Sequence, residues 1–396
     1  MAQLPNAPLP HSLSALQAEP YALQEGSSTK LFSEIHDHHI PAFASTALDR
    51  LYGSLFASQR HLELCGENVP VPHTWIAYRH GEVVAVFLFR IEASRVLVLT
   101  EMIAPQEEHL NEFRHAVFAR YPKIWLIVFN AIILPAAITK SACQWYAFSE
   151  NYILDLPPSV TDYLSSIGKS TRKTIQGYSN RLKREFPDFK WETYTAAEIP
   201  RHQQRALLRQ LQAFKSDSMS ARGKQALLDK RDRYRLMILA SECGLFGVAR
   251  VKGKVVAGSL ACRFGDSYVM LLSAADPEME PFRLGLLACY WSVCDCIRAQ
   301  ARQCHLLWGR YRYKSQLLAV PHTLFRLNMY RSRRVMLSHF SMVMTMWGQS
   351  LRYRFRHWLL NQVHERQDVF SLLVSRGLNR LRLWRVHVQK LKHANG

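Results

Sequence analysis

The sequence lacks the features that mark secreted and membrane-spanning chains. It has no uninterrupted apolar run of about eighteen residues, the length that a transmembrane helix requires, and its longest apolar stretch, Val335–Trp347, is too short. The first thirty residues have no basic start followed by an apolar core, so no secretory signal is expected. The eight cysteines follow no framework spacing, which excludes a disulfide-stapled fold and suits a reducing compartment. We therefore expect a cytoplasmic protein.

The sequence is also poor in residues arranged to bind a metal. The segment Glu34–His39 contains three histidines, but no partner residues follow at a recognised ligand spacing. Cys289, Cys294 and Cys296 fall within an apolar helical pattern, where cysteine usually packs as a small hydrophobic residue. No metal site is therefore predicted.

Acidic residues are scarce relative to basic ones. The chain has 31 Asp and Glu against 51 Lys and Arg, a formal net charge of +20. Residues 331–396 contain thirteen Lys and Arg against only Glu365 and Asp368, so this tail supplies about half of the excess. Such an excess favours anionic partners: nucleotide phosphates, an anionic membrane surface or nucleic acid. Charge alone does not choose among them.

Three apolar runs in the second half of the chain predict an antiparallel meander. Leu245–Val251, Val255–Phe264 and Ser267–Ala274 are separated by glycine-containing turns at 252–254 and 265–266. The chain then passes through two prolines into a predicted helix that begins at Arg283 and ends near Ala301, and a short strand follows at 304–308. A strand leading into a glycine-containing helix start presents free backbone N–H groups and the positive end of a dipole, which favour a pyrophosphate.

The serial order of three blocks resembles the GNAT acyltransferase superfamily. More narrowly, the chain resembles the CelD-like branch, which is found with cellulose and exopolysaccharide synthesis and is related to the Fem-type peptidyltransferases. The first block is a basic helix over 169–185 that carries Arg172, and the second is the meander with Gly258 in its middle strand. The third is the helix, strand and Gly-x(3)-Tyr-Lys pattern that ends at Lys314. The resemblance covers roughly residues 155–335, with a weaker echo before them.

The resemblance implies an α/β fold with a mixed sheet and a set of functional residues. The donor would be acetyl-CoA or another acyl-CoA, and the acceptor an amine or hydroxyl, with a sugar or exopolysaccharide precursor as the expected class. Lys314 would project at the carboxyl edge of the sheet and stabilise negative charge during transfer. The implied residues are Lys314 and Tyr313 for catalysis, Arg283, Leu284, Gly285 and Leu286 for the donor, and Arg172 and Gly309 for the acceptor.

No residue pattern identifies a general base. A base is needed to accept the proton of an attacking amine or hydroxyl, although water can relay it. No nucleophile is accompanied by a partner base, so direct transfer is favoured over a covalent acyl-enzyme. The candidate bases are Asp217, Glu242, Asp276 and His305.

The first half of the chain repeats the order helix, meander, helix and strand. A helix is predicted at 42–56, strands at 73–79, 83–91 and 96–102, a helix at 106–120, a strand at 124–129 and a last strand within 145–156. The second helix opens with two glutamates that would repel a pyrophosphate, so we interpret this copy as degenerate and as part of the acceptor groove. The predicted units are a flexible leader (1–30), a degenerate GNAT-like domain (31–156), a GNAT-like acyltransferase domain (157–332) and a basic helical extension (333–396).

The extension is predicted to be a set of basic amphipathic helices with breaks at Gly348 and Gly377. Arginine alternates with leucine and tryptophan across 350–396, a pattern that can lie on an anionic bilayer, here the inner face of the membrane. Packing of the same helices on the second domain is the alternative.

Two other functions stay open on the sequence. Aminoacyl transfer from charged tRNA, as in Fem-type enzymes, would be served by the positive charge but is less favoured than acyl-CoA. A non-catalytic accessory of a polysaccharide synthase is consistent with the position of Gly285, which lies one residue early in the acetyl-CoA signature. DNA is not an expected partner.

Overall fold

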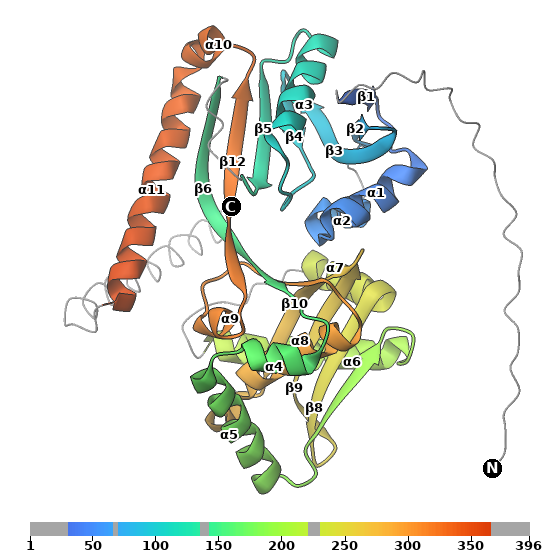
Figure 1. Ribbon diagram of the computed structural model, residues 1–396, viewed down its shortest axis with the longest axis vertical. Helices are drawn as coiled ribbons and strands as arrows, with labels where there is room; N and C mark the ends of the chain where they lie inside the picture. Colours follow the sequence, from blue (N-terminus) through green and yellow to red (C-terminus); the bar gives the residue numbers. More distant parts are fainter. Residues whose placement is uncertain (1–30, 66–69, 135–141, 221–229, 366–396) are drawn as a thin grey trace, which may run out of the picture.

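The computed structural model describes residues 31–65, 70–134, 142–220 and 230–365, which fold as a mixed α/β protein (Figure 1). The predicted leader, the predicted break at Gly377 and residues 366–396 of the predicted basic tail lie outside these residues. Among the helices of the described ranges, none combines the length and the hydropathy needed to span a bilayer.

The described strands join in one twelve-stranded mixed sheet, which confirms the expected mixed α/β class. The spatial order is β1-β2-β3-β4-β5-β12-β6-β11-β10-β9-β8-β7. The strands are β1 (Phe32–His36), β2 (His73–Arg79), β3 (Glu82–Glu92), β4 (Arg95–Val98), β5 (Leu126–Ile132), β6 (Cys143–Asp155), β7 (Lys190–Thr195), β8 (Gly244–Val251), β9 (Lys254–Phe264), β10 (Ser267–Ala275), β11 (Gln303–Leu307) and β12 (Val320–Tyr330).

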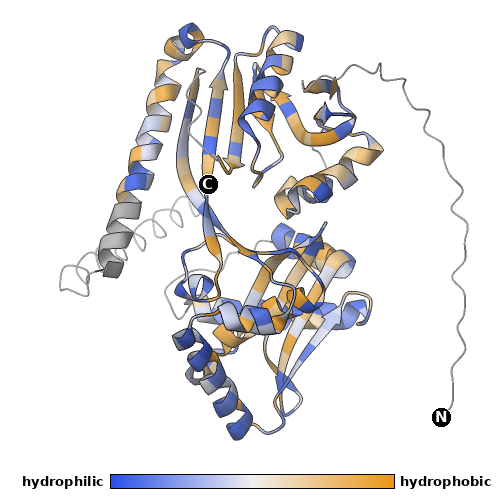
Figure 2. Cartoon of the chain, in the orientation of Figure 1, coloured by the Kyte–Doolittle hydropathy of each residue, from blue (hydrophilic) through white to orange (hydrophobic). Residues whose placement is uncertain are grey.

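Helices cover both faces of this sheet. They are α1 (Ala42–Tyr52), η1 (Leu55–Ala57), α2 (Gln59–Cys65), α3 (Glu107–Arg120), α4 (Val160–Ser166), α5 (Lys169–Glu185), α6 (Arg201–Ser220), α7 (Lys230–Cys243), η2 (Pro277–Phe282), α8 (Leu284–Arg298), α9 (Arg312–Gln316), α10 (Arg333–Ser338) and α11 (Phe340–Glu365). The strands are mainly apolar, whereas α5 is mainly hydrophilic (Figure 2).

One structural unit occurs in both halves of the chain. In the first half, the meander β2–β3–β4 is followed by α3 and by β5, which pairs parallel with β4. In the second half, the meander β8–β9–β10 is followed by α8 and by β11, which pairs parallel with β10. The order of elements that the sequence predicted is thus present in both halves.

Two long strands join the halves into one sheet. β12 pairs along its length with β6, from Val320 opposite Ile153 to Met329 opposite Cys143, and its second part also pairs with β5. The last residues of β6 pair with β11. The sheet therefore continues across the predicted boundary at residue 156, and each half contributes a strand that lies beside strands of the other (Figure 1).

The second half has an apolar core on each face of its sheet. On one face, α8 packs with α4 and α5 against β8–β11, and on the other α6 and α7 pack against β8–β10. β9 lies between these two cores, and all but two of its residues are buried, as a strand covered on both faces requires. In the first half, α3 packs on one face and α1 on the other.

Five local features differ from the predictions. The strand predicted at 96–102 ends at Val98, and β1, α7 and α9 were not predicted. The predicted break at Gly348 is wrong, because α11 runs through it without interruption. A single glycine costs a helix only about 1 kcal/mol, and α11 offsets that cost by packing along β6.

Candidate active site

The candidate site lies where two parallel strands of the second half separate. β10 and β11 pair only from Ser267 opposite Gln303 to Val269 opposite His305. Beyond this point β10 continues to Ala275, while β11 has an irregularity after His305 and turns away at Leu307, whose φ of 57° is left-handed. Ligands of α/β proteins gather at the carboxyl ends of separating parallel strands, and two cavities open here.

The smaller cavity, of about 490 Å³, lies at the start of α8. It brings together all four residues that the sequence predicted for the donor, Arg283 to Leu286, with the end of β10 at 273–275. Tyr313, a predicted catalytic residue, lines the same cavity from α9, together with Tyr311 and Arg312. This part of the predicted site is thus assembled in one place.

The start of α8 leaves room for a ligand to approach the backbone. Arg283 has a left-handed φ of 48°, and its carbonyl accepts bonds from the N–H groups of Leu286 and Leu287. The first N–H groups of a helix have no acceptor within it. A Cβ built on Gly285 would have no atom within 4 Å, so the space beside this glycine is open to a ligand. The residues present fit a pyrophosphate, although Asp276 and Glu280 also line the cavity and partly offset Arg283, Arg312 and Lys215.

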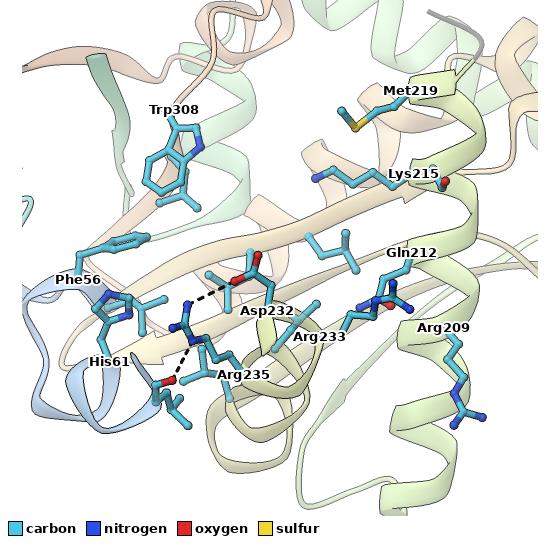
Figure 3. Close-up of a pocket in the computed structure, with 18 of the residues that line it drawn as sticks. Phe56, His61, Arg209, Gln212, Lys215, Met219, Asp232, Arg233, Arg235 and Trp308 are labelled. Carbon is cyan, nitrogen blue, oxygen red and sulfur yellow. Dashed lines mark hydrogen bonds and ion pairs between the residues drawn. The ribbon is translucent and has the colours of Figure 1, made fainter. Parts of the chain in front are cut away.

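The larger cavity, of about 910 Å³, lies between the two halves of the molecule (Figure 3). Its polar walls come from α6, with Arg209, Gln212 and Lys215, and from α7, with Asp232, Arg233 and Arg235. The first half contributes Leu55, Phe56, His61 and Leu64, and Trp308 follows the end of β11.

Lys215 and Met219 line both cavities. Figure 3 shows the Lys215 side chain extending from α6 across the sheet, with its nitrogen on the side of Trp308. Burial lowers the pKa of its ammonium group below the ordinary lysine value. A lysine on an amphipathic helix has no sequence signal for such a role, because its neighbours come from segments far along the chain.

Lys314 is buried and turns inward, with only 2% of its surface exposed. Its Nζ donates hydrogen bonds to the carbonyl oxygens of Leu307, at 2.9 Å, and Trp308, at 2.8 Å. It also lies 5.0 Å from the ring centroid of Tyr152 and 5.7 Å from that of Tyr311. Burial is the main cause that lowers its pKa to about 8.

Lys314 therefore supports the wall between the cavities. Leu307 and Trp308, whose carbonyls it holds, line the larger cavity, and Tyr311 lines the smaller one. The lining of neither cavity includes Lys314 itself. The sequence predicted that the Lys314 side chain projects at the sheet edge. Instead, the chain turns sharply after β11, and the ammonium group binds the two backbone carbonyls of this turn, which need hydrogen-bond donors once they are buried. A catalytic role for Lys314 stays a prediction.

The two predicted acceptor residues have structural contacts. Arg172 donates from Nη2 to the carbonyls of Ser165, at 3.2 Å, and Ile167, at 3.1 Å, and so ties α5 to the end of α4. Gly309 has a φ of 98°, and a Cβ there would lie 2.8 Å from the Tyr311 ring. Neither residue is among those that line the two cavities.

Of the four candidate bases, only Asp276 lines a cavity, the smaller one. Its side chain accepts the N–H of Glu278 at 3.0 Å. Glu242 forms an ion pair with Arg60, and Asp217 is exposed on α6. His305 is buried beside Asn151, and burial lowers its pKa to about 4, so it is neutral at pH 7. Among the described residues, no group of three or more His, Cys, Asp or Glu side chains is placed to hold a metal ion.

Comparison with protein families identifies one domain. Residues 169–315, from the start of α5 through Lys314 on α9, match the family described as acetyltransferase (GNAT) domain, which is the CelD-like family. A search of curated proteins found no match.

A search of solved structures found FemX, which has a similar fold at low sequence identity, and weaker matches. The crystal structure of FemX is 10% identical, with a TM-score of 0.54, and the match covers 77% of this chain and 99% of FemX. L-PGS from Bacillus licheniformis is 15% identical, with a TM-score of 0.45 and coverage of 81% and 99%. A tandem GNAT protein from the clavulanic acid biosynthesis pathway is 10% identical, with a TM-score of 0.36 and coverage of 76% and 98%. At these identities the likeness to FemX concerns the fold alone.

Proposed function

Because residues 169–315 form a GNAT domain within a sheet that resembles that of FemX, we propose that the protein is an acyltransferase that uses acyl-coenzyme A. The observation that carries this proposal is the smaller cavity. It lies in the GNAT domain, where β10 and β11 separate, and combines an open helix start with a channel along the end of β10.

The start of α8 would bind the donor pyrophosphate. The backbone N–H groups at Leu284 and Gly285 supply donors, and the side chains of Arg283 and Arg312 supply positive charge. Coenzyme A contributes a thioester, whose carbonyl carbon is attacked while the thiol leaves.

The larger cavity would bind the acceptor. Both halves line it, which agrees with a first unit that has lost donor binding and forms part of the groove. α3 of that unit opens with Glu107 and Glu108, which disfavour a pyrophosphate there. The acceptor amine or hydroxyl would attack directly, and its proton would pass through water to the leaving thiolate. A sugar or a polysaccharide precursor is the acceptor class that we propose.

Acetyl-CoA titration tests the donor. The folded full-length protein should bind acetyl-CoA with a stoichiometry of one in calorimetry, and release of thiol should be detectable once an acceptor is supplied. Absence of binding to the folded protein would contradict the proposal. Binding without any turnover across a panel of sugars and amines would favour the alternative of a polysaccharide synthase accessory.

Salt dependence separates acyl-CoA from tRNA as the donor. The net charge of +20 predicts that the protein binds tRNA weakly at low salt, and that this binding disappears by about 0.2 M salt because each neutralised phosphate releases counterions. Acetyl-CoA binding should persist at that salt concentration. Binding to tRNA that survives with a discrete stoichiometry would instead support aminoacyl transfer of the Fem type.

A further inference from the structure

The larger cavity has an unbalanced charge. Among the described residues that line it, four are basic and Asp232 is the one carboxylate. Asp232 is also bound to Arg235, at 3.3 Å. His61 adds no charge at pH 7, because burial and the nearby Arg235 lower its pKa to about 4. The cavity is therefore positive and disfavours a further cation. The basic residues are Arg209, Lys215, Arg233 and Arg235.

Lys215 has no hydrogen bond or ion pair with any described residue. Its ammonium group is nevertheless desolvated, as the direction of its pKa shift shows, and an uncompensated buried charge is costly. An anion in the cavity would remove that cost, because the attraction between opposite charges is strong where water is excluded.

The opposite wall of the cavity is aromatic. The ring centroids of Phe56 and Trp308 lie 5.2 Å apart, and His61 lies 5.0 Å from Phe56. Trp308 is 49% exposed, so one ring face is available to a ligand. Such a face accepts the apolar side of a sugar or another ring, and Figure 3 shows the Lys215 nitrogen extending from α6 toward this side of the cavity.

We propose that the acceptor is a sugar phosphate, with its ring against Trp308 and its phosphate held by Lys215. The proposal rests on the proposed function, since it takes the larger cavity as the acceptor side. The new proposal adds an anionic group to the acceptor and states that a residue of α6 binds this group. Lys215 then binds the acceptor at the point where the two cavities meet.

Glucose 1-phosphate and glucose are matched probes for this site. Glucose 1-phosphate should bind the full-length protein at least about tenfold more tightly than glucose in titrations followed by NMR. Lys215→Met should lower its affinity by about tenfold, and Lys215→Arg should restore most of it. Trp308→Ala should weaken both sugars. Lys215→Met should fold normally, since it removes a desolvated charge and keeps the apolar stem.

Gly285→Val separates this proposal from the donor proposal, because Gly285 lines only the smaller cavity. This variant should keep the affinity for glucose 1-phosphate while losing acetyl-CoA. Glucose binding as tightly as its phosphate, or an affinity for the phosphate that Lys215→Met leaves unchanged, would overturn the proposal. So would a wild type that binds acetyl-CoA but not glucose 1-phosphate. If acetyl-CoA failed to bind while glucose 1-phosphate bound as expected, the donor proposal would be contradicted and the anion site would stand.

A second, independent feature is an exposed apolar stripe on α10 and α11. From Phe340 the spacing of its members is four, three, four and four residues, which places them on one face of α11. The opposite face packs on β6, where Met346 is buried and Gln144 donates to the carbonyl of Val343 at 2.9 Å. The stripe consists of Leu337, Phe340, Met344, Trp347, Leu351 and Phe355, each between 42% and 71% exposed.

Basic residues flank this stripe. Arg333 and Arg334 lie at its beginning and Arg352 and Arg354 near its end, all exposed and without a bond to another described residue. Residues 331–355 contain no Asp or Glu. An apolar face of this length bordered by arginine matches a surface of anionic lipid, where aromatic rings enter the headgroup region and arginine meets phosphate.

We infer that the α10–α11 face binds an anionic lipid surface, which moves the membrane-binding segment upstream of the 350–396 tail that the sequence suggested. The full-length protein should co-sediment with vesicles of phosphatidylglycerol and phosphatidylcholine and much less with phosphatidylcholine alone. The double variant Phe340→Ser, Trp347→Ser should reduce the bound fraction by about tenfold, since both lost side chains are exposed. Phe43→Ser, which alters an exposed ring on α1, is the control.

Two outcomes would overturn this inference. One is vesicle binding that is equal for the double variant and the wild type. The other is a wild-type dimer in analytical ultracentrifugation that the double variant converts to a monomer, which would assign the face to a second copy of the chain.

Discussion

Gly285→Val should lower the affinity for acetyl-CoA by about a hundredfold and leave the fold intact. The added side chain would enter open space, since a Cβ at this position meets no atom within 4 Å, so the protein need not rearrange. The branched side chain would however occupy the space through which a pyrophosphate reaches the first N–H groups of α8. Calorimetric titration with acetyl-CoA and a thermal melt measure the two effects.

Gly177→Val is the matched control for this substitution. Gly177 is also a helical glycine whose added Cβ would meet nothing within 4 Å, but it lies on α5 and lines neither cavity. Gly258 cannot serve, because its added Cβ would lie 2.6 Å from the carbonyl oxygen of Gly247 in the middle of the sheet. If both variants lost the same affinity for acetyl-CoA, the proposal that the donor binds at the start of α8 would be contradicted.

Lys314→Met should lower turnover by about a hundredfold, whichever of two roles the ammonium has. If the ammonium group stabilises negative charge during transfer, the substitution removes the positive charge that does so. If it only positions the wall between the cavities, the substitution releases Leu307 and Trp308. The stability of the variant should also fall, by about 1–3 kcal/mol, because two buried carbonyls lose their donor. Lys173→Met, at an exposed position on α5, is the control.

The pH dependence of stability gives a readout specific to this lysine. Its pKa is about 8 in the folded protein and near 10.4 in an unfolded chain. Between these values the unfolded chain holds a proton that the folded protein has released, so this group makes the free energy of unfolding rise with pH. Lys314→Met should remove that rise, measured by denaturation between pH 8 and 10. A normal turnover at saturating donor would contradict both roles.

The predicted and the unpredicted parts of the site differ in how far apart their residues lie in the sequence. Arg283 to Leu286 are consecutive, so a correct helix start was enough to place them together. The larger cavity depends on contacts between η1, α6, α7 and the end of β11, which are separated by up to about 250 residues, and no local pattern encodes them.

Lys314 shows a second limit of local patterns. Its position after a strand was predicted correctly, but the direction of its side chain was not. That direction follows from Leu307 and Gly309, whose positive φ values turn two carbonyls inward. A leucine in the left-handed region has no sequence signal, since this conformation is held by the surrounding fold rather than favoured by the residue.

The pairing of β12 with β5 and β6 governs the order in which this chain can fold. Phe325 lies opposite Ile132, almost two hundred residues earlier in the chain, so the centre of the sheet closes only after β12 has been synthesised. Contacts of such long range slow folding, and until β12 arrives the edges of β5 and β6 stay open to wrong pairing. The nascent chain is therefore most vulnerable to aggregation late in translation, and its two halves become stable together.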